Sequence, residues 1–284
     1  MFFDAYRNVM RPFLREASVS CDTDLIALLF DGGIDALPDG TKQFFTYAFS
    51  AGAAAVAKKQ YLPSAAAGYS FGIYAALHAA EVLSFEDGLF LLDQADKLMS
   101  AASEGHSFGM GIIVGLGPKD IAVLLESGEF ETVLETNCNH DHCHVFSGEA
   151  SELDAFLKAA EADGAFKFER LDVQIPYHHP ALLAEVPEAF RAHCDGLKWH
   201  RPLFPVISTI DGSALTDPDA ILDYTARHPA TPIRWTAALK TFYLRKVETL
   251  FECGPGISLT QNGRFVPYET TYINAKKVGM WGSL

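Results

Sequence analysis

The chain has 284 residues, of which 49% are hydrophobic and 20% are charged. This balance is that of a globular protein and excludes a disordered, collagen-like or coiled-coil chain. The length allows two domains, or one large domain with an insertion. The 22 basic and 36 acidic residues give a formal net charge of −14, which argues against a nucleic-acid partner because the chain would repel a phosphate backbone.

Neither export nor membrane insertion is indicated. No run approaches the roughly 18 uninterrupted apolar residues of a membrane-spanning helix. Asp4, Arg7 and Arg11 stand where a secretory signal would be apolar. The five cysteines are odd in number and form no CxxC pair, so we expect neither a disulfide framework nor a zinc ribbon. We expect a cytoplasmic protein with no membrane partner.

Three helices are expected around a short strand-like run. Residues 41–59, rich in alanine and dotted with aromatic residues, predict the first helix, and residues 72–81 predict the second. Ser84 and Asp87 have the spacing of a capping box ahead of an apolar run. The third helix should therefore start at this box and end near residue 102.

The pattern changes in residues 105–173. A strand, a helix, two short strands, a helix and a strand follow one another, the last strand being predicted at residues 166–175. This is the split βαβ pattern, whose two ends lie close together and suit an inserted small domain. Residues 174–284 return to alternating helices and strands, so we expect one α/β domain, residues 1–104 and 174–284, interrupted once.

The most informative motif is G-x-S-x-G at residues 68–72, between a strand-like run and a helix. A sharp turn there would lift the Ser70 hydroxyl onto the N-terminus of the helix, and we expect neither flanking glycine to tolerate a Cβ. The backbone N–H of Phe71 would supply half of an oxyanion hole. The alternative is a glycine-bounded turn in which Ser70 only caps the helix.

A serine nucleophile needs a base, normally a histidine. His178 and His179 stand out because they follow the last strand of the inserted unit, where a strand end can point into a cleft. The pattern alone does not separate them. A polar pair of loop residues at a domain junction is the alternative.

A second histidine cluster lies at residues 140–144. His140, His142 and His144 would share one face of an extended segment, and imidazole is a common zinc ligand. Cys143 would point away from that face, however, and no complementary ligand pair lies elsewhere at a customary interval. We expect a polar hairpin turn and no metal site.

Four basic residues near the C-terminus offer one place for an acidic partner: Arg234, Lys240, Arg245 and Lys246. A run of this kind is more often a solvated helix face.

The motifs GYSFG (68–72), IPYHHP (175–180) and FECGPG (251–256) occur in this order. With them, nearly the whole chain resembles the malonyl-CoA:acyl-carrier-protein transacylase family, which includes the acyltransferase domains of polyketide synthases. Further matches are Asn137 and Asn139 ahead of the strand HVFSG, and TPIRW at residues 231–235.

The resemblance implies an α/β fold with two parts. Residues 1–104 and 174–284 would form an α/β-hydrolase-like core with a mostly parallel sheet, and residues 105–173 a ferredoxin-like small domain. The active site would lie in the cleft between them.

The resemblance also assigns roles. Ser70 is similar to the nucleophile that becomes acylated, and His178, rather than His179, looks like its general base. A backbone carbonyl near His228 would orient that histidine. The substrate-binding positions would be Tyr69, Ala95, Asn139, Tyr177 and His228, and the oxyanion position Phe71.

The implied reaction is S-acyl transfer in fatty acid or polyketide biosynthesis. An acyl group would pass from acyl-CoA to Ser70 and then to the phosphopantetheine thiol of an acyl carrier protein, with no cofactor.

Two departures from the family qualify this expectation. Ala95 stands where the family usually carries an arginine that clamps the carboxylate of malonyl groups, so an uncharged acyl group is favoured unless Arg170, Arg227 or another cation reaches in. The family's N-terminal loop, whose glutamine contributes to the oxyanion hole, has no match in the sequence. We expect a late chain start, a segment supplied from elsewhere, or catalysis with one donor fewer, and losing such a donor typically costs about 100- to 1,000-fold in turnover. The alternatives are an acyl-carrier hydrolase and a non-catalytic docking subunit of a synthase.

Overall fold

The computed structural model describes residues 2–31, 37–126 and 130–275. Ser84 caps the third predicted helix, since its side chain accepts a hydrogen bond of 2.9 Å from the Asp87 N–H. Within the described residues, no helix is long and apolar enough to cross a membrane. The helices before the inserted unit are α1 (Phe2–Ser20), α2 (Leu25–Asp31), α3 (Asp39–Lys58), α4 (Gly72–Ala79) and α5 (Phe85–Ser103).

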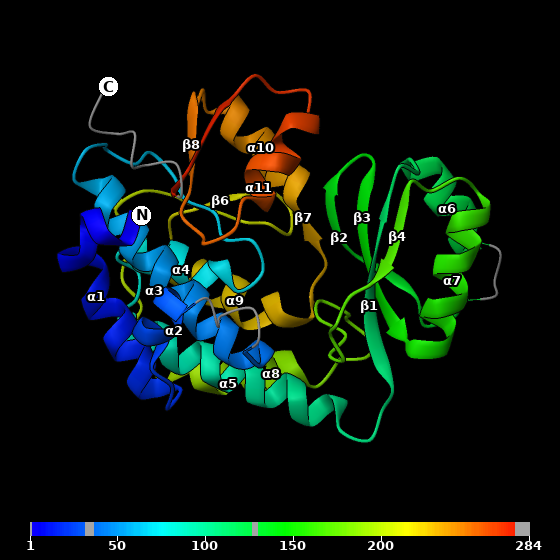
Figure 1. The fold of residues 1–284 in the computed structure, drawn as a ribbon, viewed down its shortest axis with the longest axis horizontal. Coiled ribbons are helices and arrows are strands. Elements are labelled where there is room, and N and C mark those ends of the chain that lie inside the picture. Colours follow the sequence, from blue (N-terminus) through cyan, green and yellow to red (C-terminus); the bar gives the residue numbers. More distant parts are fainter. Residues whose placement is uncertain (1, 32–36, 127–129, 276–284) are drawn as a thin grey trace.

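The middle of the chain forms the predicted split βαβ pattern. Its strands are joined in the order β4-β1-β3-β2, all antiparallel, and a short strand from the C-terminal part, β7 (Ile233–Arg234), adds to β2 in parallel. Helices α6 and α7 cover the outer face of this sheet (Figure 1). The division into domains at residues 105 and 173 stays a prediction. The elements are β1 (Phe108–Val114), α6 (Pro118–Glu126), β2 (Leu134–His140), β3 (Cys143–Glu149), α7 (Ala150–Ala162) and β4 (Lys167–Arg170).

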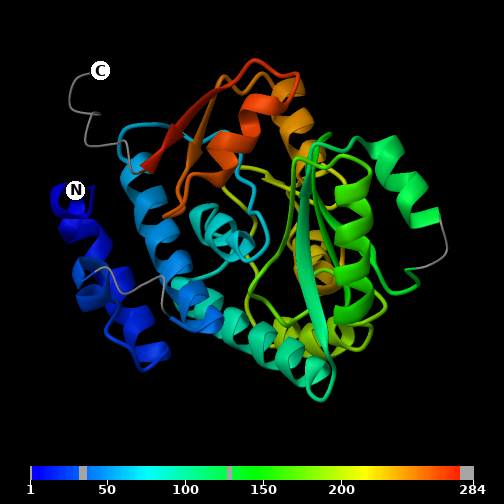
Figure 2. The ribbon, with the colours of Figure 1, turned by 45° about the vertical axis from the view of Figure 1, so that its right-hand side comes forward.

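The sheet separates two apolar cores because successive side chains of a strand point to opposite faces. Met110, Ile112 and Val145 join the large cluster formed with the helices. Ile113 and Phe146 join a smaller cluster beneath α7. Helix α1 lies outermost on the helical side, against α3 (Figure 2). One face of β2 and β3 therefore faces the large helical core, and the other faces the smaller cluster beneath α7.

Strand β4 is shorter than the strand predicted at residues 166–175. Its last sheet contact is the Leu171 N–H, which donates to the Met110 carbonyl over 2.9 Å. The next carbonyl along β1, that of Phe108, accepts instead from the Arg170 guanidinium over 3.2 Å. Because a side chain has taken this acceptor, the strand ends, and the chain reaches His178 through an irregular segment rather than from a strand end.

The remaining elements alternate helix and strand, but the strands are short. Ala66 forms a single parallel bridge to Val206, and β8 pairs with β9 in parallel. Pro205 has no N–H to continue the bridge into a ladder. The parallel core sheet is therefore in short pieces, while the five-stranded sheet is mostly antiparallel. The elements are α8 (Val186–Asp195), β5 (Val206–Ile207), β6 (Ala214–Leu215), α9 (Pro218–Arg227), η2 (His228–Ala230), α10 (Trp235–Leu244), β8 (Thr249–Glu252), α11 (Ser258–Asn262), η3 (Gly263–Phe265) and β9 (Thr271–Asn274).

Candidate active site

The G-x-S-x-G motif forms a sharp turn into α4, with Ser70 in the left-handed region at φ 49°. A Cβ on Gly68 would lie 2.1 Å from the Ile73 backbone nitrogen, so only glycine fits there. A Cβ on Gly72 would meet nothing within 4 Å. The expectation that both glycines are sterically required is wrong for Gly72, because its Cβ would leave the first turn of the helix toward open space.

This difference predicts that two alanine variants change the free energy of unfolding by very different amounts. Gly68→Ala should lower the free energy of unfolding by about 3 kcal/mol or more, since backbone atoms cannot yield as a flexible side chain would. Gly72→Ala should change it by less than about 1 kcal/mol, because alanine is the better helix former. Urea denaturation of both variants measures the difference, and equal losses would contradict this steric argument.

The structure brings Ser70 and His178 together. Ser70 Oγ lies 2.8 Å from His178 Nε2. No side chain caps α4, whose N-cap residue is Phe71, so the Ser70 hydroxyl is not a helix cap. The His178 Nδ1 donates to the His228 carbonyl over 3.1 Å. Because Nδ1 must carry the proton for that bond, Nε2 is left as an acceptor facing the serine.

The His178 backbone is held as firmly as its ring. The residue has a φ of 64°, and its N–H donates to the Pro229 carbonyl over 2.9 Å. The carbonyl behind the ring belongs to His228, whose Nε2 lies 3.3 Å from Thr209 Oγ1 inside the core. Ser70 and His178 are both strained non-glycine residues, and such strain persists where the surrounding structure fixes it.

Burial lowers the pKa of His178 to about 4, against 6.5 for an exposed histidine. The residue is 3% exposed, and a buried imidazole is disfavoured in its charged form. Burial likewise lowers the pKa of His228 well below its usual range. His178 is therefore a neutral base throughout the physiological range.

A pH prediction follows from this shift. If Ser70 is acylated with His178 as base, the acylation rate should stay flat from about pH 8 to 5 and fall with a midpoint set by a pKa of about 4. Below pH 6.5 the unfolded chain takes up this proton before the folded one, so stability falls as the pH drops toward 4, by about 3 kcal/mol. Rapid-mixing acylation and urea titrations at each pH measure both, and a midpoint near 6.5 would refute it.

The structure separates the two neighbouring histidines. His179 Nε2 donates to the Thr132 carbonyl over 2.9 Å, and its Nδ1 accepts from the Leu182 N–H over 3.2 Å. Both nitrogens of His179 are thus bonded to backbone groups, and only His178 reaches Ser70.

Tyr69 is anchored to strand β2. Its hydroxyl donates to Asn139 Oδ1 over 2.7 Å and accepts from Asn137 Nδ2 over 3.0 Å. Burial raises the pKa of Tyr69, so the phenol stays neutral. Of the two asparagines, only Asn139 was expected at the site; Asn137 is its equal partner in this network.

Tyr177 connects the turn that carries His178 to the turn that carries Ser70. Its ring meets the Phe71 ring edge-on, with centroids 5.3 Å apart. Its hydroxyl accepts from Gln43 Nε2 over 3.2 Å. The sequence did not predict Gln43 as a site residue, because a single polar residue in an alanine- and aromatic-rich helix gives no signal of its own.

The structure gives the surroundings of Ala95, the position that the resemblance assigns to substrate binding, and of the two candidate arginines. Ala95 is fully buried in the apolar core on α5. Arg170 binds Asp154 over 2.8 Å, in addition to two backbone carbonyls. Arg227 is exposed in the last turn of α9.

A cavity of about 920 Å³ lies beside Tyr177, between the start of α3, the end of α5 and residues 172–177. Gly40, Asp96, Lys97 and Gln174 are among its lining residues, whereas Ser70 and His178 are not.

Residues 140–144 lie at the predicted hairpin: His140 ends β2, Asp141 and His142 form the turn, and Cys143 and His144 begin β3. The three histidines have different partners. His140 stacks on Phe265 with ring centroids 4.9 Å apart, and its Nδ1 accepts the His142 N–H. His144 Nδ1 lies 2.6 Å from Glu135 Oε1. Burial would lower the pKa of His144, but its hydrogen bonds to Cys138 and Glu135 raise it to about 10.

The four basic residues near the C-terminus differ in their surroundings. Arg234 lies 3.5 Å from a Glu135 oxygen. Lys240, Arg245 and Lys246 are exposed on α10 and just after it.

A serine on a strained turn, a buried neutral histidine and a carbonyl behind it define the class of α/β proteins that act through an acyl-serine. No family model matches the sequence. The malonyl CoA-acyl carrier protein transacylase of Salmonella typhimurium is 32% identical over 200 residues, which are 70% of this chain and 64% of that protein. The chain thus matches less than two thirds of that relative's length.

Solved structures share the fold over almost the whole chain. A malonyl-transacylase in complex with a type II polyketide synthase acyl carrier protein is similar with a TM-score of 0.89 and 26% identity, over 99% of this chain and 93% of that one. An acyl carrier protein S-malonyltransferase from Vibrio cholerae gives 0.85 and 28%, over 94% and 88%. The chain is similar to malonyl-CoA:acyl carrier protein transacylases and shares their α/β fold.

Proposed function

We propose that the protein is an S-acyltransferase that moves an acyl group from acyl-CoA to the phosphopantetheine thiol of an acyl carrier protein. The observation that best supports this proposal is the 2.8 Å contact between Ser70 Oγ and His178 Nε2. The His178 Nδ1 at the same time donates to the His228 carbonyl. A coenzyme A thioester and an acyl carrier protein both appear in the names of relatives. The proposed reaction uses no cofactor.

The pair supports a two-step reaction. Nε2 takes the hydroxyl proton as Ser70 Oγ attacks the thioester carbon, and returns it to the CoA sulfur as the C–S bond breaks. The carrier thiol then gives its proton to Nε2 and attacks the acyl-serine, and the serine oxygen leaves with that proton. The Phe71 N–H donates no hydrogen bond to another described residue, so it is available to the oxyanion.

We also propose that the acyl group carries no carboxylate. A free carboxylate is best held by a bidentate guanidinium. Ala95 offers no donor, and the Arg170 guanidinium is bound to Asp154 and backbone carbonyls.

Mass spectrometry of the intact protein tests both proposals. The protein is mixed with acetyl-, butyryl-, hexanoyl- and malonyl-CoA in turn, and the adduct on Ser70 is located by peptide mapping. We expect rapid labelling by uncharged acyl groups and slow labelling by malonyl. Faster malonyl labelling would refute the uncharged acyl group, and no labelling by any thioester would refute the acyl-serine.

Adding a phosphopantetheinylated acyl carrier protein to the labelled protein tests the second step. The label should move to the carrier thiol. Free acid released from an acylated carrier protein, with no transfer to a second carrier, would instead make the protein an acyl-carrier hydrolase.

A further inference from the structure

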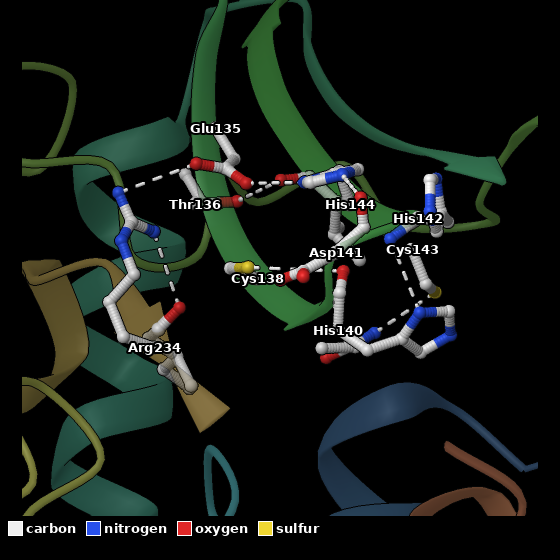
Figure 3. A network of polar contacts seen from close by, with 12 residues as sticks. Glu135, Thr136, Cys138, His140, Asp141, His142, Cys143, His144 and Arg234 are labelled. Carbon is white, nitrogen blue, oxygen red and sulfur yellow. Dashed lines mark hydrogen bonds and ion pairs between the residues drawn. The ribbon is translucent and has the colours of Figure 1, made fainter. Parts of the chain in front are cut away.

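Three different metal-ligating side chains meet on the β2–β3 hairpin. The ligand atoms of Glu135, Cys138 and His144 all lie within 4.8 Å of one another. Figure 3 shows Glu135 between Arg234 and His144, with the Cys138 sulfur below them. The His144 side chain is 2% exposed and that of Glu135 21%. The proposed acyl transfer uses none of the three.

A bulge in β2 is what places Glu135 and Cys138 on one face. In a regular strand, residues three apart point to opposite faces. Here the pairing with β3 shifts between Glu135 and Asn137, so one extra residue restores the phase. Cys138 then pairs directly with His144. Glu135 pairs with Phe146, whose side chain lies on the same face of β3 as that of His144.

We infer that Glu135, Cys138 and His144 form a binding site for one zinc ion. Zinc accepts oxygen, sulfur and nitrogen ligands in one tetrahedral site, and three protein ligands leave a fourth position for water or a small ligand. The thiol argues against magnesium and calcium, which prefer oxygen ligands alone.

The surrounding contacts orient the ligands as metal sites require. His144 Nε2 donates to the Asp141 carbonyl over 3.1 Å, which directs Nδ1 toward Glu135 and is the usual outer bond of a ligating histidine. Arg234 holds the other Glu135 oxygen at 3.5 Å, and Arg234 sits beside Cys138 in the parallel pair of β2 and β7.

Small movements would complete the site. Zinc ligands in a tetrahedron stand about 3.4 Å apart, so the 2.6 Å Glu135–His144 contact must open, while no pair of ligand atoms is more than 4.8 Å apart. The thiol proton of Cys138 and the Nδ1 proton of His144 are released to solvent when the metal binds, and the thiolate sulfur and Nδ1 become ligands.

The site is separate from the acyl-transfer machinery. Asn137 directly precedes Cys138 without a bulge between them, so its side chain points to the opposite face, where it binds Tyr69. The zinc site and the acyl-transfer site therefore share no ligand or catalytic group and can be tested separately.

Cobalt(II) is the probe, because a thiolate ligand gives it a sulfur-to-metal charge-transfer absorption. The full chain is freed of metal with a chelator and titrated with Co²⁺, and then with Zn²⁺. We expect one Co²⁺ per chain, a charge-transfer band, and loss of that band as Zn²⁺ displaces the cobalt. A wild-type protein without the band would overturn the inference.

Variants identify the ligands. Cys138→Ser should remove the band and weaken zinc binding at least about 100-fold, and Glu135→Gln, which keeps the side-chain shape, at least about 10-fold. Cys143→Ser is the matched control, because this neighbouring thiol accepts from Asn139 instead, and it should keep the band. A band that survives Cys138→Ser, or that is lost only in Cys143→Ser, would refute the site, and zinc binding by Glu135→Gln decides the matter if Cys138→Ser does not fold.

Discussion

Ser70→Ala should abolish acylation of the protein by every acyl-CoA and lower acyl transfer at least about 10⁴-fold. The serine oxygen is the only atom of this residue that meets the base, at 2.8 Å from His178 Nε2. Alanine keeps the Cβ and the backbone, so the elbow should persist. Intact mass after mixing with acyl-CoA measures the adduct, and a transfer assay to the acyl carrier protein measures the rate.

The control for this variant is Ser64→Ala, six residues earlier, where the serine is exposed. It should label and transfer as the parent does. A Ser70→Ala protein that still becomes acylated at the parental rate would place the nucleophile elsewhere and remove the basis of the proposed function.

The chemistry-bearing residues were predictable where a local pattern determines the backbone. Two glycines around a serine, between an extended run and a helix, indicated the elbow at Ser70, and the capping box at Ser84 gave the start of α5. The order of helices and strands in residues 105–173 followed from hydrophobic periodicity, which reports which face of each element is buried.

What the sequence could not indicate depends on contacts between distant segments. His178 and His179 are distinguished only by their partners, Ser70 in one case and Thr132 in the other. The end of β4 depends on the Arg170 side chain reaching the Phe108 carbonyl. In each case a tertiary contact, rather than any local preference, selects the outcome.

The bulge in β2 is a further example, because bulges leave no reliable mark in a single sequence. The sequence pattern suggested the three histidines at residues 140–144 as possible metal ligands. The trio that the fold assembles instead takes only His144 from them and adds Glu135 and Cys138. Counting every second residue along β2 would have placed those two on opposite faces.

His178→Asn should lower the rate of Ser70 acylation at least about 10⁴-fold, because an amide cannot take the hydroxyl proton. Asparagine is the suitable replacement, since it tolerates the left-handed φ of 64° better than other non-glycine residues. His179→Asn is the matched control, because the neighbouring ring bonds only to backbone groups. It should stay within about 10-fold of the parent rate.

The double variant Ser70→Ala, His178→Asn separates a working pair from two independent contributions. When a nucleophile and its base act as a unit, removing the second group costs little once the first is gone. The double variant should therefore be no slower than the slower single variant, within about 3-fold. If the two losses multiplied instead, His178 would act on the reaction by a route other than the Ser70 hydroxyl, and the 2.8 Å contact between them would not be the catalytic one.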